Sequence, residues 1–181
     1  LFFDWYLRFL FNKKKARQLK TKIKKELNKL YKKLHLKNNC FTHRDFHASN
    51  IMISKKGFGL IDSQDAIIGN PLYDVASLID DVRIKIPQQT KEKLFEYYLK
   101  KSRFKKAKSK NDFDILSVQR NLKILGIFVR LHIRDKKSNY LKFLPYTWRL
   151  IEMRLKNPIF HNLKILIDES ISKKKRKRKK F

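Results

Sequence analysis

The 181-residue sequence contains little cysteine, which cross-links a chain, and little glycine or proline, which interrupt helices and strands. It has one cysteine, Cys40, which excludes an internal disulfide and a zinc site built on cysteine pairs. No apolar run approaches the roughly 18 residues that a membrane-spanning helix needs, and the longest is Ile124 to Val129. Hydrophobic residues still make up 42% of the chain, enough to bury a core of about one domain.

The N-terminal segment lacks the features of a targeting sequence. Residues 1–6 have no basic flank and no small-residue cleavage site, so they do not form a signal peptide. An initiator methionine is also missing, and the first methionine is Met52. We therefore expect the chain to begin inside a longer protein, and we expect that protein to be cytoplasmic without contact with a membrane.

Acidic residues are scarce: 16 Asp and Glu stand against 46 Lys and Arg, a formal charge of +30. Such a charge is typical of proteins that bind nucleic acid, but 34 lysines against 12 arginines also fit the codon bias of an AT-rich genome. Residues 41–83 differ from the rest, with four basic and six acidic side chains and a charge of −2. This retention of carboxylates indicates a functional site for a metal and phosphate.

The hydrophobic pattern predicts an α+β fold that is mostly helical. Residues 16–36 place leucine or isoleucine at steps of three and four, which is typical of an amphipathic helix. A strand is expected at 40–42 and a hairpin at 51–61, with its turn at Gly57. Further helices are expected at 1–11, 73–83, 90–101, 112–134, 140–156 and 159–171. Residues 101–110 are expected to be a basic linker and Asp112 a helix cap, and we expect a domain at 1–171 followed by a disordered basic tail at 172–181.

The strongest motif is His43-Arg44-Asp45-Phe46-His47-Ala48-Ser49-Asn50, followed twelve residues later by Asp62. Phosphoryl transfer needs a carboxylate beside the acceptor hydroxyl and oxygen ligands for magnesium on the nucleotide phosphates. Asp45 can accept the hydroxyl proton, while the hairpin returns Asp62 to the metal that Asn50 also binds. The spacing therefore predicts a kinase-type catalytic loop.

These residues resemble the aminoglycoside-phosphotransferase and choline-kinase branch of the protein-kinase-like fold. His47 stands where protein kinases have lysine, as is usual in that branch. The match is closer to bacterial kinases of N-acetylmuramate and N-acetylglucosamine, through residues 43–52, 61–66 and 69–78 and through 119–128, 130–131, 140–141 and 144–145. Ser63 departs from that pattern, since these relatives usually carry phenylalanine there.

The resemblance implies a role for each matching residue, with ATP and Mg²⁺ as cofactors and a small-molecule substrate. Asp45 is the expected catalytic base, and Asn50 and Asp62 are the expected magnesium ligands. Three residues are expected to order the loop or approach the phosphate: His43, Arg44 and His47. Four are candidates for acceptor binding: Gln64, Asp65, Arg120 and Arg130. Asp74 is expected to fix the catalytic loop. Plain structural roles stay open for several of these, such as a surface carboxylate for Asp65 and a helix cap for Asp74.

An N-terminal lobe is missing from the expected fold. Kinases of this type need a five-stranded sheet with a phosphate-covering loop and a strand lysine, whereas the 42 residues before His43 have a helical pattern and contain no glycine. We therefore expect the chain to be the C-terminal lobe of a sugar kinase involved in cell-wall recycling, inactive alone. Kinases for an aminoglycoside, choline or homoserine are alternatives, as are an inactive pseudokinase and a basic protein that binds nucleic acid through its tail. The oligomeric state is left open.

Overall fold

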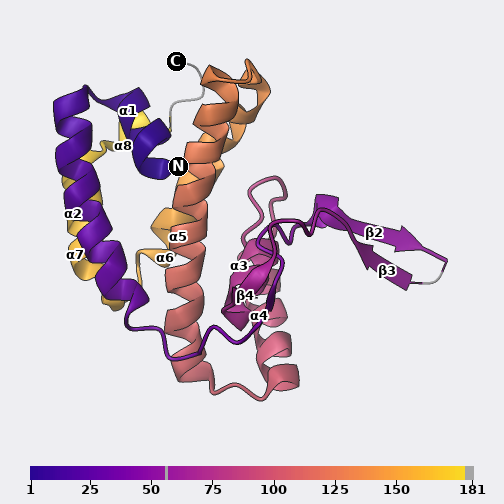
Figure 1. Ribbon diagram of the computed structural model, residues 1–181. Helices are drawn as coiled ribbons and strands as arrows, with labels where there is room; N and C mark the ends of the chain where they lie inside the picture. The colour runs from indigo at the N-terminus through magenta and orange to yellow at the C-terminus, as the bar shows by residue number, and fades with distance from the viewer. Residues whose placement is uncertain (56, 178–181) are drawn as a thin grey trace. The chain divides into compact units, whose positions relative to one another are not determined.

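The computed structural model describes residues 1–55 and 57–177 of the chain. It divides into two compact units, which are described separately (Figure 1). Unit 1 consists of Leu1–Lys33 and Val118–Phe181, and unit 2 of Leu34–Ser117. The described residues are mostly helical with two small sheets, which confirms the coarse fold class expected from the sequence.

Unit 2 contains the strands of the described chain and the helices that follow them. In chain order these are β1 (Cys40–Thr42), the 3₁₀ turn η2 (Ala48–Asn50), β2 (Ile51–Ser54), β3 (Gly57–Leu60), β4 (Ile67–Gly69), α3 (Pro71–Ile79), α4 (Gln88–Ser102) and the first part of α5 (Lys106–Ile133). β1 pairs with β4 and β2 pairs with β3, both antiparallel. The expected strand and hairpin are therefore present, and β4 adds a strand that the pattern did not reveal.

The polar turn before α3 is built by Asn70 and Pro71. The side chain of Asn70 accepts a hydrogen bond from the backbone N–H of Leu72 at 3.0 Å, and Pro71 occupies the first helical position, where its missing N–H costs nothing. α3 then packs on α4 and α5 through a buried apolar cluster: Leu72, Ala76, Ile79, Phe95, Leu99, Phe113 and Leu116. This cluster fixes the helix that begins beside the loop of residues 43–50.

The secondary structure of unit 1 is helical, with no strand among its described residues. It contains the π-helical turn η1 (Phe2–Tyr6), α1 (Leu7–Leu10), α2 (Lys13–Tyr31), the remainder of α5, the 3₁₀ turn η3 (Ser138–Phe143), α6 (Leu144–Arg154), the 3₁₀ turn η4 (Pro158–Phe160), α7 (His161–Ser170) and α8 (Lys173–Arg176). α2 lies beside α7 (Figure 1), with Leu19 and Ile23 on one helix and Leu163 and Ile167 on the other all buried. The amphipathic helix expected from the leucine spacing is thus present, although it begins earlier and ends at Tyr31.

Two sequence expectations are wrong in this part of the chain. The second half of the expected basic linker is helical, because α5 begins at Lys106, and Asp112 lies inside that helix rather than at its cap. Its fully buried carboxylate accepts the backbone N–H groups of His35 at 3.0 Å and Leu36 at 2.8 Å. A carboxylate that satisfies two N–H groups of a loop tolerates burial in a helix interior.

The first residues of the expected disordered tail form a helical turn. Arg176 in α8 is only 3% exposed, stacks on the Trp148 ring and donates to the Ile171 carbonyl at 2.8 Å. It also pairs with the carboxylates of Glu152 and Asp168, both at 2.8 Å. Burial alone raises the pKa of the Asp168 carboxyl, but hydrogen bonds from Lys164 and Arg176 lower it below its ordinary value overall. The sequence predicts disorder from residue 172 onward, whereas the structure describes an ordered segment up to Lys177. Residues 178–181 lie outside the described residues.

Candidate functional site

The motif residues gather at one end of the strand pair β1 and β4. β1 runs directly into the loop that begins at His43, and Thr42 is paired with Ile67, the first residue of β4. The segment 62–66 therefore arrives beside the start of the loop, while the β2–β3 hairpin connects the two. A hydrogen bond from the Arg44 guanidinium to the Asp65 carbonyl at 3.1 Å joins them directly.

The Asp74 carboxylate holds the start of the catalytic loop. It accepts the backbone N–H of His43 at 2.6 Å and that of Arg44 at 3.0 Å, one on each oxygen. Asp74 stands in the first turn of α3, where the helix dipole favours a negative charge. The side chain thus joins the loop to the helix rather than capping its own helix, since Asn70 already supplies the cap.

Two further bonds attach the loop to the strand end that carries Asp62. The His43 ring donates through Nε2 to the Ile61 carbonyl at 3.0 Å, and the Ile61 N–H donates to the Asn50 carbonyl at 3.1 Å. The Asn50 side chain donates through Nδ2 to the Asp45 carbonyl at 3.0 Å. His43 is 1% exposed and Asn50 8%, so these bonds form a buried frame around the loop.

The proposed base is accessible while its neighbour is buried. The Asp45 side chain is 50% exposed, and one of its oxygens lies 3.6 Å from Nε2 of His47, whose side chain is 6% exposed. The Nδ1 atoms of both histidines, His43 and His47, are buried without a hydrogen-bond partner in the described part of the chain. A half-exposed carboxylate beside a fixed imidazole can accept a proton from a hydroxyl that approaches from solvent.

The backbone is strained at both ends of the site. Arg44 and Asp62 have φ angles of +70° and +69°, a region that residues with a Cβ adopt rarely and at a cost of about 1–3 kcal/mol. Such conformations persist where surrounding bonds impose them, as Asp74 and Asp65 do for Arg44. The sequence gives no sign of these two angles.

The oxygen atoms expected to bind magnesium are available. Asn50 uses its nitrogen for the Asp45 carbonyl, and its side-chain oxygen has no hydrogen-bond partner among residues 1–55 and 57–177. Asp62 is exposed and receives the Gln64 amide on one oxygen at 2.6 Å, which leaves the other open. Hard oxygen donors of this kind suit Mg²⁺. Three or more His, Cys, Asp or Glu side chains do not converge on a metal position anywhere in the described chain, so water or nucleotide phosphates would supply the remaining ligands of a bound Mg²⁺.

The structure places two of the four candidate acceptor residues beside the loop. Gln64 and Asp65 lie in the segment bonded to it and are exposed. Arg120 and Arg130 belong to unit 1, where Arg120 is 2% exposed and donates to Asn121 at 3.4 Å. Contact of these two arginines with an acceptor stays a prediction.

Sequence reasoning missed a buried charged network in the same unit. The Lys91 ammonium lies 2.7 Å from Asp80, with the two side chains 3% and 0% exposed, and Ser117 donates to the other oxygen of Asp80 at 2.6 Å. Lys91 sits among several lysines on α4, and nothing in its sequence neighbourhood separates it from the exposed ones. Asp80 is followed directly by a second aspartate, Asp81, so the local sequence does not mark it as the buried partner either.

Comparison with known families agrees with the geometry of the loop. The family model described as the phosphotransferase enzyme family matches residues 1–108, which is more than half of the chain. The chain therefore belongs to the phosphotransferase enzyme family.

Several curated proteins that are similar to this chain are named as sugar kinases. An N-acetylmuramate/N-acetylglucosamine kinase of Pseudomonas aeruginosa is 32% identical over 159 residues, 84% of this chain and 47% of that protein. Kinases of the same name from Caulobacter vibrioides and Neisseria meningitidis are 29% and 35% identical over 72% and 58% of the chain, and over 38% and 34% of their own lengths. The chain thus spans less than half the length of these relatives. Among the described residues, no helix is long and apolar enough to cross a membrane.

Proposed function

We propose that the chain is the C-terminal, catalytic lobe of an ATP-dependent kinase that phosphorylates a hydroxyl of an amino sugar. The observation that carries the proposal is the frame of bonds from Asp74, His43 and Asn50 that fixes the 43–50 loop against the strand end bearing Asp62. A kinase needs a base and metal-binding oxygens held in register, and little covalent chemistry from the protein. The relatives named as N-acetylmuramate/N-acetylglucosamine kinases supply the acceptor class.

In this proposal each residue of the site has its own role. Asp45 accepts the proton of the acceptor hydroxyl, and His47 keeps the Asp45 carboxylate in place. Asn50 and Asp62 would hold Mg²⁺, which when bound neutralises charge on the nucleotide phosphates. Gln64 and Asp65 are positioned to bind hydroxyl groups of the acceptor, with Arg44 fixing the segment that carries them.

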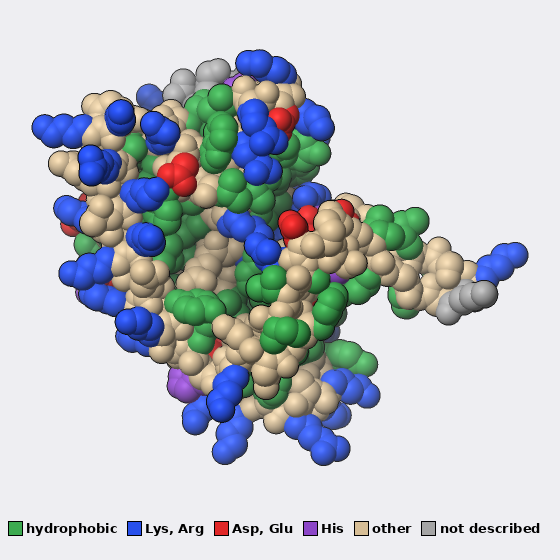
Figure 2. All heavy atoms as spheres, viewed as in Figure 1, with side chains coloured by type: hydrophobic (Ala, Val, Ile, Leu, Met, Phe, Trp, Pro, Cys, Tyr) green, Lys and Arg blue, Asp and Glu red, His purple; other side chains and the backbone are tan. Residues whose placement is uncertain are grey.

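Exposed apolar side chains around the site support the need for a second lobe. Ile53 and Phe58 on the hairpin are each 81% exposed, and Phe41 and Ile68 on the β1–β4 pair are 63% and 67% exposed. Figure 2 shows hydrophobic side chains along the projecting hairpin. Contiguous apolar surface of this kind marks a site that another part of a protein covers, and we infer that an N-terminal, nucleotide-binding lobe covers it.

The test is phosphate transfer from labelled ATP in two proteins. One is the chain alone, and the other is a chimaera in which the N-terminal half of the Pseudomonas aeruginosa kinase precedes Leu1. We expect transfer only from the chimaera, with N-acetylmuramate or N-acetylglucosamine preferred over an aminoglycoside, choline and homoserine. A chimaera that binds ATP but phosphorylates another member of this panel would replace the acceptor assignment. One that phosphorylates none of them would contradict the proposal.

A further inference from the structure

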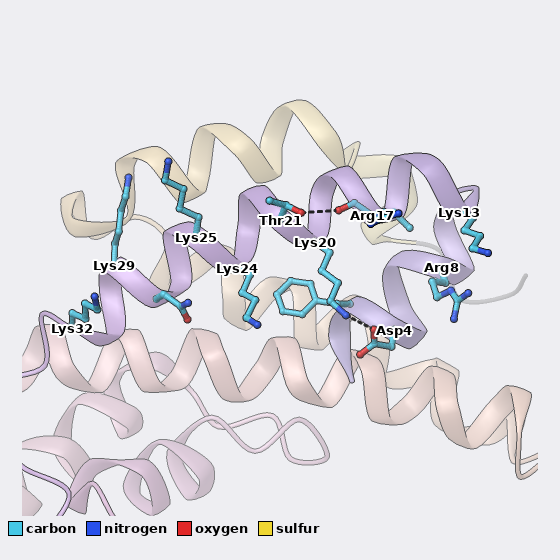
Figure 3. A pocket seen from close by; sticks show the side chains of 13 residues that line it. Asp4, Arg8, Lys13, Arg17, Lys20, Thr21, Lys24, Lys25, Lys29 and Lys32 are labelled. Atoms are coloured by element: carbon cyan, nitrogen blue, oxygen red, sulfur yellow. Dashed lines mark hydrogen bonds and ion pairs between the residues drawn. The ribbon is translucent and has the colours of Figure 1, made fainter.

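A hollow in unit 1 is lined mostly by lysine and arginine side chains (Figure 3). Its volume is about 880 Å³, and it is formed by η1, α1 and α2. Eight of its lining residues are cations and one is acidic: Arg8, Lys13, Arg17, Lys20, Lys24, Lys25, Lys29, Lys32 and Asp4. The acidic residue, Asp4, is already bound to Lys20 at 2.7 Å, so it adds little to neutralise the others.

The cations on α2 form a row along the hollow. Positions 13, 17, 20, 24, 28 and 32 follow one another at helical steps of three and four, and all six line the hollow. Five are Lys or Arg, and position 28 is Asn28. Figure 3 shows Lys13, Lys20, Lys24 and Lys32 spread over the length of the helix, which is about 28 Å for 19 residues at 1.5 Å each.

Most of this row is not neutralised within the protein. Lys13, Arg17, Lys24 and Lys32 are exposed, and none forms an ion pair with a carboxylate in the described part of the chain. Neighbouring cations one helical turn apart lie well within the Debye length of about 8–10 Å, so they repel one another. A bound polyanion would remove that repulsion.

The positive charge is also segregated in the chain. Unit 1 carries 31 Lys and Arg against six Asp and Glu, and unit 2 carries 15 against ten. Without residues 173–180, unit 1 still has an excess of 17 positive charges, against five in unit 2. Lysine enrichment from genome composition acts on both units, so it does not by itself account for this difference.

We infer that the hollow along α2 binds a single strand of nucleic acid through its phosphates. A row of cations repeating every helical turn matches a backbone that carries one charge per nucleotide, and lysine contacts of this kind are independent of base sequence. A concave row favours a strand that can enter it over the flat surface of a bilayer. Phe3, which also lines the hollow, offers a ring on which a base can stack.

This surface differs from the basic tail that the sequence suggested. Arg176 is buried among carbonyl and carboxylate oxygens and is not available to a ligand, whereas the row on α2 is exposed. The inference is also independent of the kinase proposal, because the hollow involves none of the residues from His43 to Asp74.

The experiment compares two quadruple variants of the 181-residue chain that have the same net charge. The hollow variant replaces Lys13, Arg17, Lys24 and Lys32 with Gln, and the control variant replaces Lys93, Lys100, Lys105 and Lys108 of unit 2 with Gln. All eight side chains are exposed, so circular dichroism should show that both variants fold. Binding of a fluorescent 20-nucleotide oligo-uridine is followed by anisotropy between 50 and 200 mM salt.

We expect the hollow variant to bind at least tenfold more weakly than the control variant at 50 mM salt. Its slope of log K against log salt should fall by about 3, since each phosphate contact with a single strand contributes about 0.7. Equal losses in the two variants would overturn the inference, because net charge alone would then explain the binding. Unchanged oligonucleotide binding with selective loss of binding to phosphatidylserine vesicles would overturn it in favour of a membrane surface.

Discussion

The buried charged side chains of unit 2 are mainly acidic, with Lys91 as a basic one, whereas those of unit 1 are basic. In unit 2 four aspartates are at most 1% exposed: Asp80, Asp81, Asp112 and Asp114. In unit 1 none of the six acidic side chains is buried, but Arg120, Arg154 and Arg176 are. A buried charge is retained only where specific partners replace water. The four buried aspartates of unit 2 are therefore held by partners inside its fold, whereas the acidic side chains of unit 1 remain in contact with solvent.

The largest effect on stability should come from the buried pair in unit 2. Asp80→Ala removes the carboxylate that the buried Lys91 ammonium contacts at 2.7 Å, and we expect a loss of about 3–5 kcal/mol in the free energy of unfolding, measured by urea denaturation. The double variant Asp80→Leu/Lys91→Met removes both charges and should recover most of that loss. A loss below about 1 kcal/mol for Asp80→Ala would show that this pair contributes no more than a surface pair.

A smaller effect is expected where Asp74 holds the catalytic loop. Asp74→Ala removes the acceptor of two backbone N–H groups, and we expect about 1–3 kcal/mol of destabilisation, again from urea denaturation. Asp74→Asn keeps one acceptor oxygen, so its free energy of unfolding should lie between that of Asp74→Ala and that of the original chain. If Asp74→Ala is as stable as the original chain, the loop does not depend on α3 for its position.

The smallest effect should come from the exposed pair in unit 1. The hydrogen bond from Lys20 lowers the pKa of the Asp4 carboxyl below its ordinary value, and the two side chains are 44% and 54% exposed. Asp4→Asn should therefore cost less than about 1 kcal/mol at neutral pH and still less at high salt.

The stability difference between Asp4→Asn and the original chain should depend on pH, because the pKa of Asp4 is lowered in the folded state. A lowered pKa in the folded state stabilises the protein above the unfolded pKa of about 4 and loses that contribution as the pH falls further. The stability of Asp4→Asn should thus approach that of the original chain as the pH falls below about 4. If the difference in stability between Asp4→Asn and the original chain grew as the pH fell, the lowered pKa of Asp4 would be contradicted.

Local patterns in the sequence predict the elements of this fold better than their connections. The leucine spacing predicts α2, and the Asn-Pro turn together with the apolar face predicts α3, because each depends on neighbouring residues. The partners of Asp112 and Lys91 lie 77 and 11 residues away, so no local pattern reveals them. β4 escaped prediction because its three residues, Ile67–Gly69, run directly into Asn70 and Pro71, so that the segment is typical of a turn.

In the candidate site, too, a local pattern predicts the segment but not the contacts that it makes. The motif from His43 to Asn50 identifies the loop, since its residue types and spacing are tied to the chemistry. The bonds that shape it are not readable in advance, including the His43–Ile61 bond and the positive φ angles at Arg44 and Asp62. These depend on how the ends of the β2–β3 hairpin close on the loop.

The central claim is that the 43–50 loop is a site of phosphate transfer with Asp45 as its base. The most direct measurement is turnover of the chimaera carrying Asp45→Asn, with Glu169→Gln as a control that removes one exposed carboxylate in unit 1. We predict a fall of about 10²–10⁴ in turnover for Asp45→Asn, with ATP affinity retained and Glu169→Gln unchanged. Undiminished turnover of Asp45→Asn would contradict the account.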